Sequence, residues 1–514
     1  MFTDKLEGKW ANWFITACAG SSFLLFGYDQ GVMGGLLTGD AWVAQFPEIN
    51  TNKGANGSAS LQGTVVAIYE IGCLAGSLLA FAIGDYLGRR RMIMLGSLIL
   101  IVGAALQTAA YGIPQLIVGR IVAGIGNGIN TSTVPLWHSE TTRAHNRGRA
   151  VATELAINTF GTMSSYWIDY GFSFVKNQSQ FRAPLGFQMV FAIVTLVLIQ
   201  WCPESPRWLL SRGKEAEAQA VLRQLSVEPP AYRDAVVDAE FKQIVEWINE
   251  EKAALVRDGK PISQFRACFT NGKDRYFHRL VLGMGSQFMQ QLCGINAIAY
   301  YSAVIFEQSV GLARNTALLL AGGNGIVNHL ASIPPIFIID RIGRRKLMIW
   351  SVAGQAVCMA LMAGGTSTTA YGPGIVATTG IFFFSFFFAS GLLSVPWLYP
   401  TEIAPLPIRT CSAALGSASN WIWNFVVVEI TPISLHSIGY KTYIYFAIFN
   451  ALFIPLIYFF YPETRQLSLE NVDLLFTGPK VLLHLPEELR VPEPLSDVET
   501  KGDGRSDFVH AEFK

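Results

Sequence analysis

Apolar residues recur along this chain in blocks of about 20, the length of helix needed to cross a lipid bilayer. A long polar segment, residues 203–277, divides the blocks into two sets of six. The first set covers approximately residues 12–37, 60–83, 92–110, 114–136, 148–170 and 184–202, and the second covers 279–306, 315–339, 347–366, 373–399, 411–432 and 441–461. The pattern predicts an all-α membrane protein with twelve transmembrane helices.

The two sets of spans define the expected domain organisation. We expect an N-terminal half at residues 1–202, a linker at 203–277, a C-terminal half at 278–462 and a tail at 463–514. Lys214–Leu225 and Ala239–Ala254 show helical patterning, so the linker should be helical. From about Glu487 the tail loses apolar periodicity, and we expect it to be largely disordered.

Composition supports this class and narrows the chemistry. Charged residues make up 15% of the 514 residues, whereas they make up about a quarter of a typical soluble protein. The net charge of +1 gives no reason to expect a nucleic-acid partner. No spacing typical of a metal site, no nucleophile–base set and no cofactor-binding loop is present, so we expect neither an enzyme nor a bound cofactor.

Positive charge is concentrated in loops on one side of the predicted membrane. The loops after spans 2, 4, 8 and 10 carry Arg89, Arg90 and Arg91; Arg143, Arg147 and Arg149; Arg341, Arg344, Arg345 and Lys346; and Arg409. Positively charged loops stay in the cytoplasm, so both termini should lie there. We expect a monomer in the plasma membrane. Asn56-Gly57-Ser58 then lies in an outer loop, where Asn56 is a candidate glycosylation site.

A dense group of polar residues interrupts the seventh span. It consists of Gln287, Gln290, Gln291, Asn296, Tyr300 and Tyr301. Unpaired amides cost several kcal/mol in hydrocarbon, so these groups must face a partner or a wet cavity. On a straight helix Asn296 and Tyr300 point away from the others, but unwinding at Gly294 can aim them at one ligand. We interpret the stretch as a binding site on a broken helix. The alternative is that the amides only join neighbouring helices.

Three charged motifs recur at matching positions in the two halves. Asp85–Arg90 recurs as Asp340–Arg345, Glu140 with Arg147 recurs as Glu402 with Arg409, and Pro203–Arg207 recurs as Pro462–Arg465. The repeat predicts two pseudo-symmetric parallel halves. Acids and arginines on the cytoplasmic side can pair between helices when the inner mouth is closed, although they can also be topogenic positive charges with incidental acids. The predicted inner gate comprises Asp85, Arg89, Arg90, Glu140, Arg147, Glu204, Arg207, Asp340, Arg344, Arg345, Glu402, Arg409 and Glu463.

These motifs, together with the stretch from Gln290 to Asn296, resemble those of the sugar porter family of the major facilitator superfamily, over about Trp13 to Leu475. Four more stretches are most similar to the fungal, yeast-type glycerol–proton symporters: Phe26–Gly31, Asn130–Thr133, Phe160–Asp169 and Pro396–Pro400. The resemblance implies the major facilitator fold and proton-coupled uptake of a sugar or small polyol by alternating access.

Two buried charges are expected to serve proton coupling. Asp29 lies about 25 Å up span 1 and Arg120 about 9 Å down span 4, so both lie at a similar depth in the outer half of the membrane. Because isolated ions are costly there, the two residues are natural partners. Arginine stays charged, so Asp29 should carry the proton. The alternative is a static ion pair. The roles of Glu70 and Glu154 stay open.

The resemblance also assigns substrate contacts. They are Gln290, Gln291, Asn296, Tyr300, Asn328, Trp397 and Asn420. Amides bond hydroxyl groups and an indole packs on C–H faces, which suits a sugar or polyol. One position departs from the family, because Leu155, beside Glu154, replaces a hydroxyl-binding glutamine in span 5. A hexose would lose a contact there, so glycerol is a candidate substrate.

Other functions on this fold stay open. The chain could be a hexose or pentose transporter or facilitator, or an exporter of a specialised metabolite, which the altered span 5 permits. It could also be a nutrient sensor that signals through its tail, although sensors of this family tend to have longer extensions than the roughly fifty residues found here.

Overall fold

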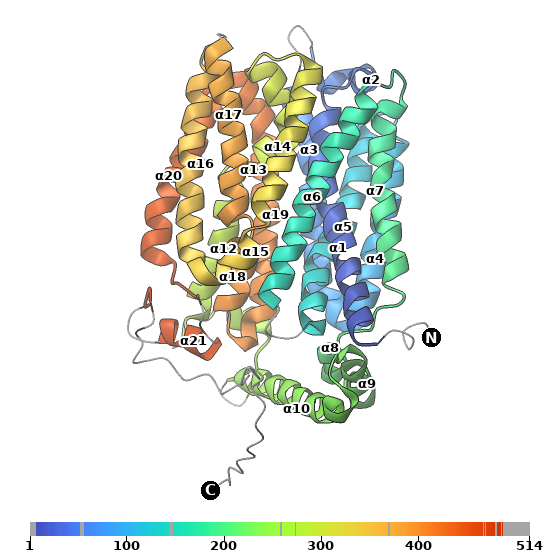
Figure 1. The fold of residues 1–514 in the computed structure, drawn as a ribbon, viewed down its shortest axis with the longest axis vertical. Helices are drawn as coiled ribbons and strands as arrows, with labels where there is room; N and C mark the ends of the chain where they lie inside the picture. The colour runs from blue at the N-terminus through green and yellow to red at the C-terminus, as the bar shows by residue number, and fades with distance from the viewer. Residues whose placement is uncertain are drawn as a thin grey trace, which may run out of the picture.

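The computed structural model describes residues 7–51, 56–142, 147–257, 260–272, 274–368, 371–465, 467, 469–477, 481–484 and 486. These residues form a bundle of long helices with a layer of short helices at one end (Figure 1). The segment predicted to be disordered, from about Glu487, lies outside the described residues.

Six long helices form the N-terminal half, drawn in blue to teal in Figure 1. They are α1 (Lys9–Leu36), α3 (Ala59–Leu87), α4 (Arg89–Thr108), α5 (Ile113–Thr141), α6 (Arg147–Ser173) and α7 (Ser179–Leu198). Their backbones touch where glycines meet, because a Cβ on Gly124 of α5 would collide with the carbonyl oxygen of Tyr69 in α3. Small residues allow this approach between membrane helices, and here they place Tyr69 in the middle of the half.

The C-terminal half repeats the pattern, but three of its six spans are broken in two. The broken spans are α12 (Tyr276–Leu292) with α13 (Ile295–Val304), α14 (Arg314–Ser332) with α15 (Pro335–Ile342), and α17 (Tyr371–Phe387) with α18 (Val395–Ile403). The unbroken ones are α16 (Arg344–Thr366), α19 (Arg409–Ile438) and α20 (Lys441–Phe460). Within the described residues, the twelve predicted spans and the all-α class are therefore confirmed, with ends that differ by several residues.

The break in the seventh span is at the predicted residue. Gly294 has φ +96° in the left-handed region, between the end of α12 and the start of α13. Residues with a Cβ rarely adopt this conformation, which explains a glycine here. A π-helical turn, Ile305–Ser309, follows α13, so this short helix has an irregularity at each end.

Length and hydropathy alone identify only half of the twelve spans as membrane-crossing helices. Six described helices are long and apolar enough to cross a membrane by length and composition: Ala59–Leu87, Arg89–Thr108, Ser179–Leu198, Arg344–Thr366, Gly372–Ile403 and Lys441–Phe460. The long helices outside this set include α1, which carries Asp29, and α5, which carries Arg120. Of these two, α1 packs against α13 of the other half, and α5 packs against α3 and α4 within its own half.

The two halves meet along three helix pairs. Helix α3 packs against α19, α6 against α14, and α1 against α13. Hydrogen bonds cross this interface, from the hydroxyl of Thr64 to Glu429 Oε1 at 2.8 Å and from the hydroxyl of Tyr166 to the carbonyl oxygen of Ala299 at 2.6 Å. Polar side chains from both halves therefore face one another along the middle of the bundle.

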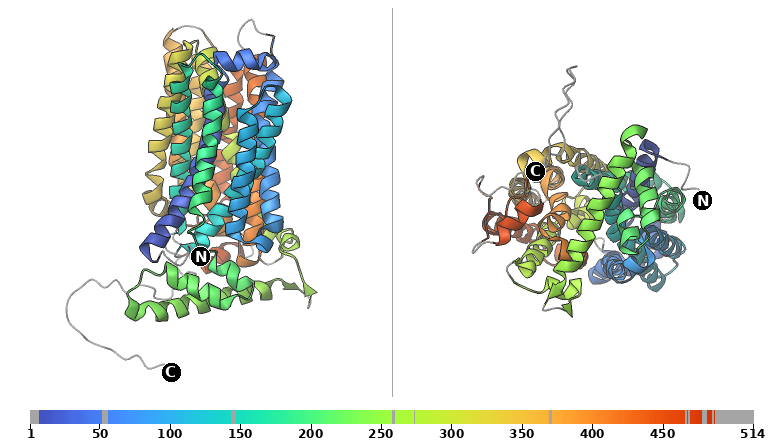
Figure 2. Two further views of the ribbon diagram at one scale, coloured as in Figure 1. Left: turned by 90° about the vertical axis from the view of Figure 1, so that its right-hand side faces the viewer. Right: turned by 90° about the horizontal axis from the view of Figure 1, so that it is seen from below.

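The linker forms short helices below the bundle, as predicted. They are α8 (Pro206–Ser211), α9 (Glu215–Leu225), α10 (Pro230–Ala254) and α11 (Gln264–Cys268). Seen from below, α10 lies across the underside of both halves (Figure 2). It begins before the predicted Ala239 because Pro230, at its first position, favours a helix start. One small departure from the all-α prediction is the pairing of β1 (Val256–Arg257) with β2 (Lys260–Pro261).

Two further helices lie at opposite ends of the bundle. Helix α2 (Asp40–Gln45), with the 3₁₀ turn Pro47–Ile49, covers the top as drawn in Figure 1. Helix α21 (Leu469–Thr477) lies at the bottom, where the guanidinium of Arg279 bonds Asp473 and lies over the ring of Phe476 at 4.4 Å. The first part of the predicted tail is therefore ordered against the C-terminal half.

Gly294→Ala tests the break. The substitution should lower the melting temperature and weaken substrate binding, because the left-handed region costs about 1–2 kcal/mol for a residue with a Cβ and the new methyl group would lie 2.8 Å from Met359 Cε. Thermal melting of the purified protein measures the effect. Gly364→Ala is the control, since a Cβ at Gly364 meets no atom within 4 Å. Equal melting temperatures for the two variants would show that the break is not strained.

Candidate functional site

Six amide side chains meet where α12, α13 and α19 converge. This central amide cluster consists of Gln287, Gln290, Gln291, Asn296, Asn420 and Asn424, each at most 5% exposed. Burial of six amides without partners would be prohibitive. The cluster therefore depends on the hydrogen bonds that its members make to one another and to carbonyl groups freed by the breaks in the helices.

Asn420 joins one side of the cluster. Its amide nitrogen donates to Gln287 Oε1 at 2.7 Å and to Gln290 Oε1 at 2.9 Å. Gln290 donates in turn to the carbonyl oxygens of Leu392 and Leu393, at 2.9 and 3.0 Å, where a π-helical turn leads into α18. Gln287 was not among the predicted contacts, but it is held in the same way as Gln290.

The break at Gly294 brings together the other side of the cluster. Asn296 follows the break and donates to Gln291 Oε1 at 2.5 Å and to Asn424 Oδ1 at 2.6 Å. On a straight helix Asn296 and Gln291 would diverge, so the unwinding unites them as expected. Asn424 was missed in the sequence, although it lies four residues after Asn420 and so on the same face of α19.

Two predicted contacts lie at the edge of this cluster. Trp397 is partly buried, and its ring centroid lies 6.5 Å from that of Phe26 in α1, which also packs edge-on against Trp421 at 5.5 Å. Asn328, on α14, is half-buried and bonds no member of the cluster among the described residues. The structure thus groups the predicted contacts Gln290, Gln291, Asn296 and Asn420 but leaves Asn328 apart from them.

Several buried polar atoms near the cluster have no hydrogen-bond partner among the described residues. They are Asn424 Nδ2, Trp421 Nε1 and Asn328 Oδ1. Two of them are donors and one is an acceptor, the pattern that hydroxyl groups satisfy from either side. These atoms could therefore bond the hydroxyl groups of a polar solute.

Asp29 and Arg120 lie together, but a third residue separates them. The Tyr69 hydroxyl donates to Asp29 Oδ2 at 2.8 Å, and the Arg120 guanidinium lies over the Tyr69 ring, 5.0 Å from its centroid. Arg120 donates to the carbonyl oxygen of Val66 at 2.7 Å and makes no ion pair with Asp29 among the described residues. The expected direct pair is thus replaced by a tyrosine that bonds the acid and carries the cation on its face.

A second carboxylate lies beside this group. Glu70 is fully buried and accepts a hydrogen bond from the Tyr300 hydroxyl at 2.5 Å. This bond joins α3 of the N-terminal half to α13 of the C-terminal half. Tyr300 is therefore turned toward a carboxylate and not toward the amide cluster.

The departure at Leu155 is structurally well defined. Leu155 is 2% exposed and belongs to the apolar core. Its neighbour Glu154 pairs with His138 Nδ1 at 2.5 Å, and the other nitrogen of that ring lies 3.4 Å from the Thr16 hydroxyl. One oxygen of Glu154 thus pairs with His138, while the other, Oε2, is buried without a hydrogen-bond partner among the described residues.

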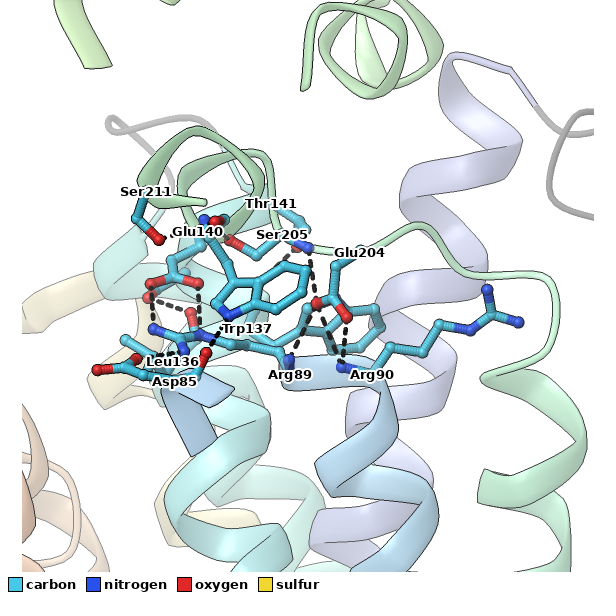
Figure 3. Close-up of polar contacts among 12 residues, drawn as sticks. Asp85, Arg89, Arg90, Leu136, Trp137, Glu140, Thr141, Glu204, Ser205 and Ser211 are labelled. Atoms are coloured by element: carbon cyan, nitrogen blue, oxygen red, sulfur yellow. Dashed lines mark hydrogen bonds and ion pairs between the residues drawn. The ribbon is translucent and has the colours of Figure 1, made fainter. Parts of the chain in front are cut away.

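The repeated charges cluster at one end of the bundle, which we call the arginine-rich end. In the N-terminal half Arg89 bonds Asp85 at 2.7 Å and Glu140 at 3.2 Å (Figure 3). Glu204 accepts from the backbone N–H groups of Arg89, at 3.0 Å, and Arg90, at 3.2 Å, at the first turn of α4. Burial raises the pKa of Glu204, and these N–H groups partly oppose that rise. The carboxylate caps the positive end of the helix.

The C-terminal half repeats this geometry residue by residue. Arg344 bonds Asp340 at 2.8 Å and Glu402 at 2.7 Å. Glu463 accepts from the backbone N–H groups of Arg344, at 2.9 Å, and Arg345, at 3.2 Å. The twofold relation predicted from the sequence thus extends to individual hydrogen bonds.

The remaining gate residues have other surroundings. Arg207 pairs with Glu251 of α10 at 2.9 Å, Arg90 donates to the carbonyl oxygen of Gln200, and Arg409 donates to that of Ala404. The side chain of Arg147 lies outside the described residues. The ion pairs of the repeated clusters link helices within one half, so any gating between the halves must act through other contacts. Asn56 is exposed in the loop before α3, at the opposite end.

This fold and these motifs match a known family. The family described as "Sugar (and other) transporter" matches residues 13–476. The chain belongs to the sugar porter family. The MFS-type transporter oryC of Aspergillus oryzae is 40% identical and covers 93% of this chain and 88% of its own. Sugar transporter STL1 of Saccharomyces cerevisiae is 37% identical, with 94% and 85% covered, and a quinate permease of Neurospora terricola is 33% identical, with 92% and 90% covered.

Solved structures agree with this assignment. The proton:xylose symporter XylE bound to 6-bromo-6-deoxy-D-glucose superimposes with a TM-score of 0.75 at 25% identity, over 90% of this chain and 99% of that one. An inward-open conformation of XylE from E. coli gives a TM-score of 0.71, over 90% and 100%. The protein is therefore a multi-pass membrane transporter of the major facilitator superfamily and not an enzyme.

The repeated caps give a testable role at the arginine-rich end. Glu204→Gln and Glu463→Gln each replace a charged acceptor at a helix N-terminus, an interaction of about 0.3–2 kcal/mol. Each should shift the transporter toward the state open at this end, because α4 and α16 are anchored less firmly. Labelling of cysteines introduced beside the two clusters measures the shift. Glu217→Gln, at an exposed pair with Lys214, is the control. Unchanged labelling in both variants would show that the capping carboxylates of Glu204 and Glu463 have no role in gating.

Proposed function

We propose that this sugar porter imports a small polyol together with protons, and that glycerol is its principal substrate. The observation that carries the proposal is the buried group of Asp29, Tyr69 and Arg120 beside the central amide cluster. A titratable carboxylate lies there within one turn of residues that face the other half. An acid at this place gains or loses a proton as the halves rearrange around the solute.

The proposed orientation follows the distribution of arginine. We infer that the arginine-rich end faces the cytoplasm, since positively charged loops are retained there, and that both termini lie on that side. Asn56 then faces the exterior of the plasma membrane, where it can be glycosylated. The charge clusters would support the inner gate by holding the helix ends together within each half, in a monomer whose working cycle is alternating access.

The proposed substrate rests on size and hydroxyl chemistry. The cluster offers amide donors and acceptors, while the buried Leu155 supplies an apolar side chain in span 5, where a hexose hydroxyl would lack a partner. The names of the relatives support a polyhydroxylated solute, since they include a sugar transporter, a quinate permease and a proton:xylose symporter. The proposal of proton coupling is supported by the similarity to the proton:xylose symporter and by the resemblance to glycerol–proton symporters.

Asp29→Asn tests the coupling. The variant should lose accumulation against a gradient and solute-induced alkalinisation, while exchange partly survives, because the neutral amide cannot carry the proton. Radiolabelled glycerol uptake in cells without their own carriers, with external pH recorded, measures both. Glu48→Gln, in the short helical turn at the opposite end, is a control away from the site. Full concentrative uptake by Asp29→Asn would refute proton coupling through this residue.

Leu155→Gln tests the substrate. In the wild type glycerol should compete better than glucose, because a glucose hydroxyl at Leu155 would be buried unpaired at about 1–3 kcal/mol. Leu155→Gln should move the preference toward hexose. Competition by glycerol, xylose, glucose and quinate against a labelled solute decides the order, with Leu155→Met as the matched apolar control. Strong inhibition of the wild type by glucose and none by polyols would make the protein a hexose carrier.

A further inference from the structure

Glu70 is the one carboxylate that hydrogen-bonds a predicted substrate contact among the described residues. It has 0% exposure, and its Oε1 accepts from Tyr300 at 2.5 Å. Its Oε2 is buried without a hydrogen-bond partner. Tyr300 lies on α13, six residues beyond the break at Gly294, so this bond connects Glu70 directly to the second segment of the broken binding span.

The charges around Glu70 do not balance when every group is ionised. Arg120, from α5, is close enough to attract both Glu70 and Asp29, from α1. The other titratable groups facing Glu70 are Tyr69 and Cys73 of its own helix and Tyr300 of α13, all neutral when protonated; α19 contributes the amide of Asn424. Two carboxylates thus share one guanidinium. A buried uncompensated charge is strongly unfavourable, so one proton should reside on the two acids.

The free oxygens show where that proton can bind. Asp29 Oδ1 and Glu70 Oε2 are both buried and unpartnered, while the second oxygen of each acid accepts from a tyrosine. Each carboxylate therefore has one oxygen held in place and one available to a proton. The two acids share this arrangement, although Glu70 also faces the side-chain amide of Asn424.

We propose that Glu70 is a second proton-binding residue, which shares Arg120 with Asp29 and communicates its protonation to the substrate through Tyr300. The proposal rests on the proposed function and deepens it. It assigns a role in coupling to a residue of the N-terminal half that touches the broken span of the C-terminal half.

Competition for one hydrogen atom supplies the coupling. The Tyr300 hydroxyl has a single hydrogen, which it donates either to Glu70 or to a hydroxyl of the solute. An ionised carboxylate is the stronger acceptor, and a protonated one competes less well. Proton binding to Glu70 therefore frees Tyr300 for the solute. By thermodynamic linkage, solute binding at Tyr300 raises the affinity of Glu70 for the proton by the same factor.

Infrared difference spectra of the purified protein in alkaline and acidic buffer test proton sharing without any solute. The wild type should gain a protonated-carboxyl band on acidification. Glu70→Gln and Asp29→Asn should each lose one component of this band, to which the other carboxyl groups also contribute, because the remaining acid is then balanced by Arg120 and stays ionised. Glu429→Gln is the matched control, since Glu429 also accepts a hydrogen bond from a hydroxyl group of the opposite half, that of Thr64. A full band in Glu70→Gln would overturn the proposal. Thermal melting confirms that each variant is folded.

Uptake kinetics test the link to the solute. The solute is radiolabelled glycerol, or xylose if the wild type accumulates xylose instead. Its half-saturation concentration should fall as the pH is lowered, by up to about tenfold per pH unit for one linked proton. Tyr300→Phe should retain the infrared band but lose much of this pH dependence, whereas Glu429→Gln should retain both. An unchanged pH dependence in Tyr300→Phe would overturn the route through Tyr300.

The two proposals fail in different ways. If Asp29→Asn loses concentrative uptake while Glu70→Gln accumulates solute as the wild type does, proton coupling stands and the role of Glu70 is refuted. If Asp29→Asn and Glu70→Gln both accumulate solute fully, coupling through this group is itself refuted. Loss of accumulation in both variants, with exchange retained, supports both proposals.

Discussion

The buried guanidinium of Arg120 is the constraint around which the centre of this transporter is arranged. It cannot lose its charge, and it lies 1% exposed among apolar helices, so every nearby group must accommodate a fixed positive charge. The carbonyl oxygen of Val66 and the face of Tyr69 meet part of that requirement, and two carboxylates meet the rest. The proton binding that we propose in this region follows from an imbalance in number, since one cation that never titrates faces two acids that can.

Much of the architecture could be predicted from the sequence because its signals are local. Span lengths, the break at Gly294 and the repeated charge motifs depend on residues close together in the chain. The contacts that could not be predicted join distant helices. The bond between Glu70 and Tyr300 depends on how α3, α13 and α19 are aligned along the interface, which hydrophobic periodicity does not specify. Depth alone placed Asp29 near Arg120, but it could not reveal that the Tyr69 ring lies between them.

The amide cluster shows why the two interpretations of the polar span are compatible. Its members bond one another and the carbonyl groups released at the helix breaks, so they do join α12, α13 and α19. They also remain polar groups that a hydroxylated solute can engage by exchanging one hydrogen bond for another. Such an exchange costs little where one hydrogen bond replaces another. Most of the amide groups are therefore paired without a solute, and a solute can add a partner for the few buried atoms, such as Asn424 Nδ2, that have none among the described residues.

Helix α13 has the mechanical properties of a lever. Its first six residues, Ile295–Tyr300, run from the break at Gly294, which acts as a pivot, to a kink at Tyr301, where φ is −127°. Tyr300 lies about 9 Å from the pivot, so a tilt of about 10° displaces it by roughly 1.5 Å along the arc. That displacement is enough to lengthen its bond to Glu70 beyond hydrogen-bonding distance. A rotation too small to disturb the packing of the two halves can therefore change the acceptor to which the Tyr300 hydroxyl donates. The larger movement of the transporter can follow from this change in one hydrogen bond.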